Sequence, residues 1–467
     1  MNKIMKKRPN IIFIMTDQQR HDTFSCVNDK IITPHLDELI GNSVLFKNAY
    51  CTNPSCVPSR AAIMTGKYPS ACEVPAYISY LPDHEKTFMS TLQENGYYTA
   101  VVGKQHFAES TIKKGYDMEM IIDGHAPFSK PDTLGVYADY LVEQGLNPKD
   151  MYERTLISGG VWKSDIKHHV DYFIGEKGKE WLETRLSDTE NDQPFFFTLS
   201  FPGPHHPYDL EGTKYSKMYK LEDMDFSESE YADLDQKGPQ FKNMGMYSKI
   251  YIKDYSEETF RRTKRSYYAN MTLIDEKVGE VMDVLKKHNA YDDTVIIYSS
   301  DHGDFMGDYG LVEKLQCLED SLLRVPLFIK PPVKNFVGKV VEDDVVNVDI
   351  ASTCLELAEA PIGEYLEDYT YNGYWNEEQD LKVRPYVYME AGAIRGILCD
   401  GIKTIHYVDR SYGEMYDLNV DPLERNNVWD DKAYSDAKIK NYGYLVDSLY
   451  KQTPGFDTKW NIGTPEI

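Results

Sequence analysis

Residues 56–66 read Cys-Val-Pro-Ser-Arg-Ala-Ala-Ile-Met-Thr-Gly. Pro58 suits the first turn of a helix, where its missing N–H is not needed, and Gly66 suits the position after the last turn. The segment therefore predicts a short helix that begins directly after Cys56. The free N–H groups at such a helix start favour an anion, and Arg60 adds a planar set of donors that matches a sulfate or phosphate edge. We therefore predict that Cys56 is a nucleophile facing an anion-binding site.

Apolar runs and helical patterns alternate along the chain on both sides of this segment. Strands are predicted at residues 10–16, 98–102, 195–200 and 294–299, and helices at residues 36–40, 87–95 and 265–288. This alternation predicts an α/β fold with a large, mainly parallel central sheet flanked by helices. In such sheets ligands gather at the carboxyl ends of strands. Four polar residues lie just past such ends, although they are far apart in sequence: Asp17, Lys104, His205 and Asp301.

The C-terminal part predicts a second, smaller unit. Short strand patterns at residues 386–389, 396–398 and 403–407 precede a helical pattern at 433–451, which indicates a small antiparallel sheet with one helix. We expect a catalytic domain over residues 1–375 and an α+β subdomain over residues 385–467, linked by the polar, aromatic stretch 364–380. Residues 205–260 are rich in tyrosine and acidic side chains, and they predict either insertions around the pocket or ordinary surface loops.

Composition and charge narrow the class of protein. The chain has 467 residues and a formal net charge of −24, so its overall field repels nucleic acid and anionic membranes. An anionic substrate would need a local positive pocket. The apolar run at residues 11–15 is shorter than the roughly 7–15 residues of a secretory signal, and no run approaches the ~18 residues of a membrane span. The seven cysteines lack paired spacing, which favours a reducing, cytoplasmic location without a disulfide framework or zinc cluster.

Two pairs of candidate metal ligands end predicted strands. Asp17 and Gln18 follow one strand, and Asp301 and His302 follow another. A lone Asp or His at a strand end is more often a cap or turn residue than a ligand. Two pairs on neighbouring parallel strands would converge on one ion, and their oxygen-rich character predicts a hard divalent cation such as Ca²⁺.

The segment at Cys56 resembles the signature of type I sulfatases, C-x-P-S-R-x-x-x-x-T-G, whose cysteine is oxidised after synthesis to Cα-formylglycine. Further segments resemble motifs of the same family, in the same order along the chain. They are 103–106 (G-K-x-H), 204–208 (P-H-x-P-[FY]), 300–303 with Gly307, Gly310 and Lys314 (S-D-[HN]-G…G…K), and 416–427 (Y-D-L-x-x-D-P-x-E-x-x-N). We expect the last of these to pack and turn rather than to catalyse. A hydrated aldehyde at position 56 supplies oxygen to a hard ion, whereas a thiol is a poor partner for it. The expected metal site and the expected oxidation of Cys56 therefore support each other.

The resemblance implies the alkaline phosphatase superfamily fold, a covalent mechanism and a role for each matching residue. One hydroxyl of the hydrated formylglycine would attack sulfur while Asp301 and the metal hold it. His205 would protonate the departing alcohol, with His206 a weaker candidate, and His106 would help to deprotonate the second hydroxyl. The cationic residues that would neutralise the sulfate oxygens are Arg60, Lys104 and Lys314.

Some positions depart from the pattern and keep alternatives open. Gln18 and His302 stand where many sulfatases have aspartate and asparagine, and this pair resembles phosphonate monoester and phosphodiester hydrolases of the same superfamily. Lys104 and His106 favour the sulfatase interpretation, because the G-K-x-H segment resembles the sulfate-binding form of this motif. A non-catalytic sulfate-binding relative is the third possibility. Arg20 and His21 either line the pocket or lie on the surface.

The expected partners follow from the resemblance. Many sulfatases act on glycans, so the expected substrate is a small sulfated mono- or oligosaccharide. A formylglycine-generating enzyme would mature Cys56, and no nucleic acid or membrane partner is expected. A cytoplasmic enzyme would meet imported sugars.

Overall fold

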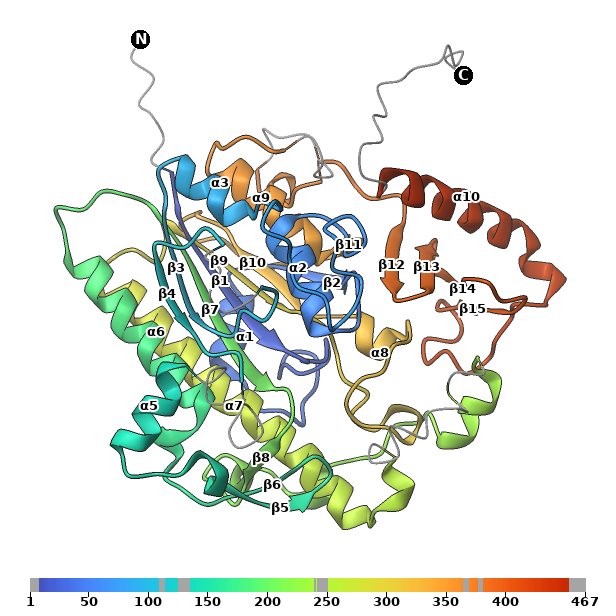
Figure 1. Ribbon diagram of the computed structural model, residues 1–467, viewed down its shortest axis with the longest axis horizontal. Helices are drawn as coiled ribbons and strands as arrows, with labels where there is room; N and C mark the ends of the chain where they lie inside the picture. Colours follow the sequence, from blue (N-terminus) through green and yellow to red (C-terminus); the bar gives the residue numbers. More distant parts are fainter. Residues whose placement is uncertain are drawn as a thin grey trace, which may run out of the picture.

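The computed structural model describes residues 8–108, 114–124, 135–238, 241, 251–363, 369–376 and 381–452. Its centre is an eight-stranded sheet (Figure 1). In spatial order the strands are β11 (Lys339–Val346), β2 (Val44–Tyr50), β10 (Leu327–Lys330), β9 (Thr294–Ser300), β1 (Asn10–Asp17), β7 (Phe195–Pro204), β3 (Tyr98–Gly103) and β4 (Met118–Ile121). The predicted fold class is confirmed.

The middle of the sheet is parallel and fully buried. Strand β1 pairs in parallel with β9 on one side and with β7 on the other, and β7 pairs in parallel with β3. The odd residues of β1, such as Phe13, belong to the core on one face, and the even residues, such as Ile14, belong to the core on the other. A strand covered on both faces needs a continuous apolar run, and this explains the signal at residues 10–16.

Helices cover both faces of the sheet (Figure 1). On the face of Phe13 lie α2 (Cys56–Thr65), α3 (Phe88–Glu94) and α9 (Ile350–Leu357). On the face of Ile14 lie α1 (Pro34–Ile40), α6 (Val170–Ser187) and α7 (Glu257–Lys287), with α5 (Val136–Glu143) beyond them. The expected helix at 265–288 begins earlier than predicted, because the Ser256 side chain accepts a hydrogen bond from the Thr259 N–H and caps it.

Two features differ from the expected pattern. Strand β10 is antiparallel to both β9 and β2, so one side of the sheet is mixed. Within the expected insertion region, β8 (Tyr208–Glu211) joins β5 (Tyr152–Leu156) and β6 (Gly159–Trp162) in a three-stranded sheet, and the rest of its described part is mostly short 3-10 helices and loops. This small sheet lies beside α7.

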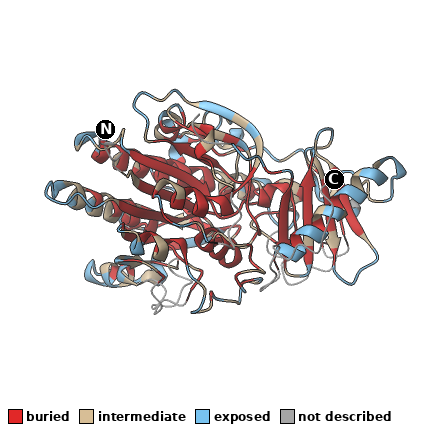
Figure 2. Cartoon of the chain, turned by 90° about the horizontal axis from the view of Figure 1, so that it is seen from above, coloured by how far each residue is buried: buried red, intermediate tan, exposed pale blue. Residues whose placement is uncertain are grey.

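The C-terminal unit has the predicted composition. It contains an antiparallel sheet of β12 (Val387–Ala391), β13 (Ile394–Cys399), β14 (Ile402–Tyr407) and β15 (Gly413–Asp417), packed against α10 (Ser435–Lys451). Its strands are buried, and α10 exposes its outer face (Figure 2). The domain boundary remains a prediction, because residues 364–368 and 377–380 of the expected linker lie outside the described residues.

The C-terminal motif at residues 416–427 packs against the first unit. The carboxylate of Glu424 is buried and pairs with Lys403. It also accepts a hydrogen bond at 2.8 Å from the N–H of Asp320, the first residue of α8 (Asp320–Leu323). Asn427 accepts N–H groups from Met415 and Trp429 at 3.0 Å. These contacts stabilise the turn, as expected. The hydrogen bond to Asp320 also connects the C-terminal unit to the first unit.

Two further observations concern the chain as a whole. The seven cysteines are free thiols. Across the described residues, none of the helices combines the length and apolar character that a membrane crossing requires.

Candidate functional site

Cys56 is the first residue of α2, whereas the sequence predicted a helix that begins just after it. Ser55 is the N-cap, and Gly66 ends the helix in the left-handed region at φ 69°, with its N–H bonded to the Ala62 carbonyl. Cys56 is almost fully buried at 1% exposure. Burial alone would raise the pKa of the thiol, but the positive charges of Lys314 and Lys104 outweigh burial and lower that pKa.

The ends of four adjacent parallel strands meet beside Cys56. Asp17 ends β1, Lys104 follows β3, His205 follows β7 and Asp301 follows β9. Because β9, β1, β7 and β3 are neighbours in that order, residues from four distant segments share one edge of the sheet.

Asp17, Asp301 and His302 form a buried group that fits a cation. Their ligand atoms lie within 4.8 Å of one another, and all three side chains are fully buried. Asp17 Oδ1 and His302 Nε2 have no hydrogen-bond partner among the described residues and lie 3.8 Å apart. His302 Nδ1 pairs with the Gly303 carbonyl at 2.8 Å, which leaves a lone pair on Nε2 directed at the carboxylates. Unpaired buried acceptors are costly, and a bound cation would satisfy these.

Gln18 lies at this group, but its side chain has other partners. Its Oε1 accepts a hydrogen bond from Lys314 Nζ at 2.9 Å, and its amide nitrogen donates to Asp304 and Tyr208. The backbone of Gln18 is held at φ 63°, where its N–H donates to Asp301 Oδ1 at 3.0 Å. Such a conformation is uncommon outside glycine and persists where surrounding contacts impose it. Gln18 Oε1 would therefore have to be shared with Lys314 if it served a cation, and its expected role as a ligand stays a prediction.

Arg60 holds the two carboxylates in place. Its Nε donates to Asp301 Oδ2 at 2.6 Å, and one terminal nitrogen donates to Asp17 Oδ2 at 3.0 Å. The other terminal nitrogen donates to the Lys104 carbonyl and to Ser200 Oγ. These contacts use four of the five donors of a fully buried guanidinium. The guanidinium therefore positions the two carboxylates, and its expected contact with a sulfate oxygen stays a prediction.

Three cationic side chains gather at the site within an acidic protein. Lys104 is 3% exposed, and its Nζ lies 2.7 Å from Asp17 Oδ2. Burial disfavours its charge, but Asp17 and Cys56 raise the pKa of Lys104, so the lysine stays charged. Burial would raise the pKa of Asp17, but Lys104 and Arg60 hold it well below its usual range. Arg60 and Lys104 pair with the two carboxylates, and Lys314 adds a third positive charge beside Gln18.

Two histidines border the site. His205 Nε2 lies 3.9 Å from Asp17 Oδ1, and His205 Nδ1 pairs with the His206 carbonyl at 2.6 Å. Burial, with Lys314 and His206, holds the pKa of His205 well below its usual range. Burial and Lys104 lower the pKa of His106 to about 4, so both imidazoles are neutral near pH 7. The backbone N–H of His106 donates to Asp123 Oδ1 at 2.9 Å.

Two glycines of the motifs are required by close backbone contacts. A side chain at Gly103 would meet the Ser200 carbonyl at 1.9 Å, and the backbone there has φ 110°. A side chain at Gly303 would meet the Ser321 carbonyl at 2.1 Å. The G-K-x-H and S-D-H-G segments therefore need glycine to bring Lys104 and Asp301 to the site.

A family model described as Sulfatase matches residues 9–360, and one described as N-sulphoglucosamine sulphohydrolase, C-terminal, matches residues 307–447. The first covers most of the chain and includes every site residue above. The chain belongs to the sulfatase family. The choline-sulfatase of Rhizobium meliloti (strain 1021) is 29% identical over 437 residues, which are 90% of this chain and 82% of that protein. The N-acetylglucosamine-6-O-sulfatase of Bacteroides thetaiotaomicron is 27% identical, over 96% of this chain and 87% of that protein.

Solved structures share the fold of this sulfatase. A phosphonate monoester hydrolase of Agrobacterium radiobacter superposes with a TM-score of 0.82 at 22% identity, with 96% of each chain covered. A protein solved in complex with its substrate D-glucosamine-2-N,6-O-disulfate superposes with a TM-score of 0.70 at 22% identity, covering 96% of this chain and 98% of that one. At 22% identity, these two comparisons show that the fold is shared and nothing about activity.

Several site residues of the sulfatase escaped the sequence analysis. Asp304 accepts hydrogen bonds from Gln18 and, at 2.6 Å, from the Tyr208 hydroxyl, and this fixes the Gln18 amide. Ser200 and Asp123 orient Arg60 and His106. Asp304 directly follows the S-D-H-G segment, and Tyr208 is the last residue of the P-H-x-P-[FY] segment. Both could therefore have been identified from their position in or next to a motif. Ser200 and Asp123 had no such signal, because their roles depend on contacts across strands.

Arg20 is a structural clamp rather than part of the sulfatase pocket. Its guanidinium pairs with Asp22 at 2.9 Å and with Asp308 at 2.7 Å, and it donates to the Asp304 and Phe305 carbonyls. It thereby ties the segment after β1 to the segment after β9. His21 Nδ1 is buried without a hydrogen-bond partner among the described residues, and burial lowers the pKa of His21 to about 3.

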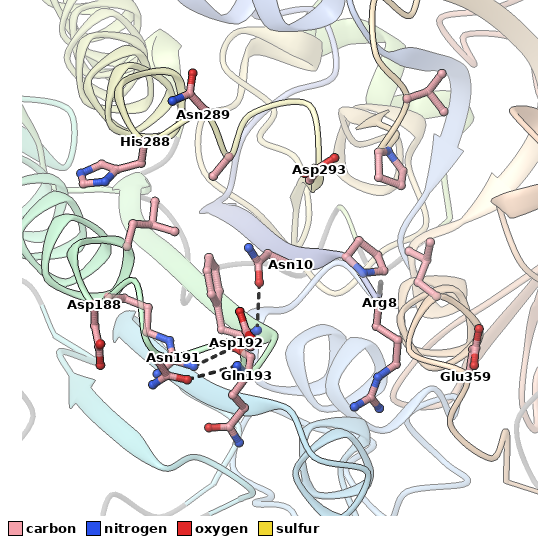
Figure 3. A pocket seen from close by; sticks show the side chains of 18 of the residues that line it. Arg8, Asn10, Asp188, Asn191, Asp192, Gln193, His288, Asn289, Asp293 and Glu359 are labelled. Carbon is pink, nitrogen blue, oxygen red and sulfur yellow. Dashed lines mark hydrogen bonds between the residues drawn. The ribbon is translucent and has the colours of Figure 1, made fainter. Parts of the chain in front are cut away.

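A cavity of about 810 Å³ lies at the other end of the central sheet (Figure 3). Asn10 and Gln193 line it at the amino ends of β1 and β7, and His288 and Asn289 line it at the end of α7. Asn10 and Asp17 are the two ends of β1, roughly 23 Å apart at the usual rise of a strand. This cavity therefore takes no part in the site at Cys56.

Proposed function

We propose that this sulfatase hydrolyses a sulfate monoester of a carbohydrate, with a formylglycine derived from Cys56 and one divalent cation. One observation carries the proposal: Cys56 lies at a helix start beside a buried group of two carboxylates and one imidazole, with two lysines facing it. The thiol matches the oxidised position of the sulfatase signature. A hydrated aldehyde there would supply the nucleophilic oxygen.

The proposed cation is Ca²⁺, held by Asp17, Gln18, Asp301 and His302. Three of these four ligands offer oxygen, which hard cations prefer. The unpaired atoms Asp17 Oδ1 and His302 Nε2 support this assignment. When bound, the cation supplies positive charge that lowers the pKa of a hydroxyl next to it and draws electrons from a sulfate oxygen.

The cationic side chains of the chain bind and orient the ester. Lys104 and Lys314 lie on the side of Asp17 and Gln18, and both can donate to the non-bridging sulfate oxygens. Arg60 holds the carboxylates of Asp17 and Asp301 in fixed positions by pairing with both of them. These charges are fixed before the ester arrives, so they stabilise charge in the transition state without reorganisation.

His205 and His106 are proposed to move protons. The Nδ1–H of His205 donates to the His206 carbonyl, so Nε2 is the atom that gains and gives a proton. His205 is neutral in the free protein, and the negative charge of a bound ester would raise its pKa and favour the protonated form. It would then protonate the oxygen of the departing alcohol. His106 is neutral above about pH 4 and can accept a proton during release of sulfate.

Relatives support a sugar as the alcohol. One relative is named an N-acetylglucosamine-6-O-sulfatase, and one structural neighbour was solved with a disulfated glucosamine. Another relative is named a choline-sulfatase, so choline sulfate belongs in any substrate panel. We further propose that a formylglycine-generating enzyme matures the protein and that it works in the cytoplasm, where the free thiols would stay reduced.

The test begins with maturation. The protein is produced with and without a co-expressed formylglycine-generating enzyme, and peptide mass spectrometry follows residue 56 in both samples. We expect the aldehyde only in the first sample, and sulfatase activity only in that sample on a panel of N-acetylglucosamine 6-O-sulfate, choline sulfate and an aryl sulfate. Cys56→Ala is the inactive control, and activity equal to the parent would refute the nucleophile.

The same preparation tests the second candidate function. Gln18 and His302 favour a phosphonate monoester or phosphodiester hydrolase, so a bis-aryl phosphate and a phenylphosphonate monoester are assayed at the same pH. A higher kcat/KM on these esters than on the sulfates would reject the sulfatase proposal. Retention of unmodified Cys56 after co-expression, together with sulfate binding and no turnover, would favour a non-catalytic sulfate-binding protein.

A further inference from the structure

An exposed aromatic loop borders the site at His106. The loop lies between α2 and α3, and three large side chains within four residues face solvent: Tyr77 at 51%, Ile78 at 88% and Tyr80 at 48% exposure. Single exposed apolar residues are ordinary, but a group of them on one short loop beside a site marks a surface for binding.

The loop is built to present these side chains. Cys72, Val74 and Leu81 anchor its two ends in the core, and the Leu81 N–H donates to the Phe107 carbonyl at 2.9 Å. His84 Nε2 pairs with Glu73 Oε1 at 2.7 Å across the base of the loop. The loop is therefore tied directly to the segment that carries Lys104 and His106, and its outward side chains keep a defined place next to the site.

Tyr77 is the member of this group that reaches the site. Its ring lies 5.6 Å from the His106 ring in an edge-to-face arrangement with an interplanar angle of 74°. Burial of the phenol and the nearby Cys56 raise the pKa of Tyr77, which is consistent with a hydroxyl end close to the nucleophile. The ring thus contacts the site at His106 while about half of the residue remains exposed.

From this geometry we infer that Tyr77 is the stacking surface for the sugar ring of the departing alcohol. The inference rests on the proposed function and adds the side of the site on which the alcohol lies. The sulfate group belongs against Lys104 and Lys314, so the alcohol must extend toward the open rim, where Tyr77 continues the edge formed by His106. An exposed aromatic face offers an apolar surface for the C–H face of a sugar. A quaternary ammonium is typically held by an aromatic cage, whereas Tyr77 presents an open face.

The test compares Tyr77→Ala and Tyr77→Phe with Tyr450→Ala. Tyr450 is a matched control, because it is 55% exposed and lies on α10 of the C-terminal unit. Loss of one aromatic contact corresponds to roughly a tenfold weaker interaction. We expect Tyr77→Ala to raise KM for N-acetylglucosamine 6-O-sulfate about tenfold with kcat within about twofold, because stacking acts equally on the bound ester and the transition state. Tyr77→Phe and Tyr450→Ala should match the parent.

Inorganic sulfate separates the two parts of the site. It is used as a competitive inhibitor, and its inhibition constant should stay within about twofold in Tyr77→Ala, because it occupies only the pocket at Lys104. An equal loss of sulfate affinity would show that Tyr77 acts by holding His106, and would overturn the inference. An unchanged KM for the sugar sulfate, or a loss confined to choline sulfate, would overturn it as well.

A binding measurement keeps this test independent of turnover. Protein made without the maturation enzyme retains Cys56, and calorimetry can follow the same sugar sulfate binding to it. Weaker binding by Tyr77→Ala than by Tyr450→Ala would support the stacking surface even if the proposed hydrolysis failed. Equal binding by the two variants would overturn the inference while leaving the proposed function intact.

Discussion

Replacing Lys104 by methionine tests the sulfatase proposal most directly. Methionine keeps most of the length and apolar body of lysine but removes its charge and its donors. Lys104 Nζ lies 2.7 Å from Asp17 Oδ2, and Arg60 also donates to that oxygen at 3.0 Å. Asp17 therefore keeps one charged partner in Lys104→Met, and we expect the variant to fold.

The size of the effect follows from the geometry. Lys104 is 3% exposed, so its charge acts through protein rather than through water. Loss of one preorganised charged donor costs about 2.7–4 kcal/mol of transition-state stabilisation, which is two to three powers of ten in kcat/KM. A sulfate monoester has three non-bridging oxygens to be neutralised, whereas a phosphodiester has two and carries a second organic group. The loss should therefore be much smaller on a phosphodiester.

The assay measures kcat/KM of Lys104→Met and of the parent on one sulfate ester and one bis-aryl phosphate, in one matured preparation of each. Lys330→Met is the matched control: Lys330 is equally buried, but it donates to the Tyr291 and Thr294 carbonyls at the amino end of β9. We expect at least a hundredfold loss on the sulfate and less than tenfold on the phosphate, with Lys330→Met close to the parent on both. Equal losses on the two esters, or less than a tenfold loss on the sulfate, would refute the reasoning.

Two further predictions concern the metal and the pH dependence. Asp301→Asn should weaken Ca²⁺ binding by roughly a hundredfold or more, because it removes one of only two anionic ligands; calorimetry measures this, and full occupancy in the variant would exclude Asp301 as a ligand. His21 has a pKa of about 3 in the folded protein, below its ordinary value, so the unfolded chain binds the extra proton and the free energy of unfolding falls as the pH drops from about 6.5 toward 4. His21→Asn should lose less thermal stability over that interval by calorimetry, and an identical slope would contradict the assignment.

The sequence predicted which residues would lie together, because their positions depend on strand ends. A buried parallel strand requires an apolar run, and the run ends where the chain reaches the edge of the sheet, so Asp17 and Asp301 could be placed at that edge from the order of residues alone. Lys104 and His205 followed the same rule. The helix at Cys56 was predicted from local signals as well, since Pro58 and Gly66 mark its two ends.

Contacts across distant segments could not be predicted in this way. Arg60 and Asp301 are 241 positions apart, and nothing local shows that the guanidinium would be used on carboxylates rather than on the ester. Helix α6 was missed because its exposed face carries many charges and its apolar stripe is interrupted. The antiparallel direction of β10 depends on how it pairs with β9 and β2. Nothing in its four-residue sequence, Leu-Phe-Ile-Lys, indicates this direction.

The role of Arg60 explains how an acidic protein can keep a ready site for an anion. Two buried carboxylates would repel one another and favour protonation, and this would weaken any cation site. Arg60 bridges both of them at 2.6 and 3.0 Å and opposes this repulsion. Burial and Asp17 still raise the pKa of Asp301 to about 6, so this carboxylate is ionised at pH 7 but takes up a proton in mildly acidic solution. Their charge is then available to a cation, while Lys104 and Lys314 supply positive charge beside Asp17 and Gln18. The long-range field of a chain with net charge −24 is screened within about 8–10 Å in physiological salt. Within that distance the buried lysines act on a ligand more strongly than the distant acidic residues do, and this supports the proposal that an anionic sulfate ester binds here.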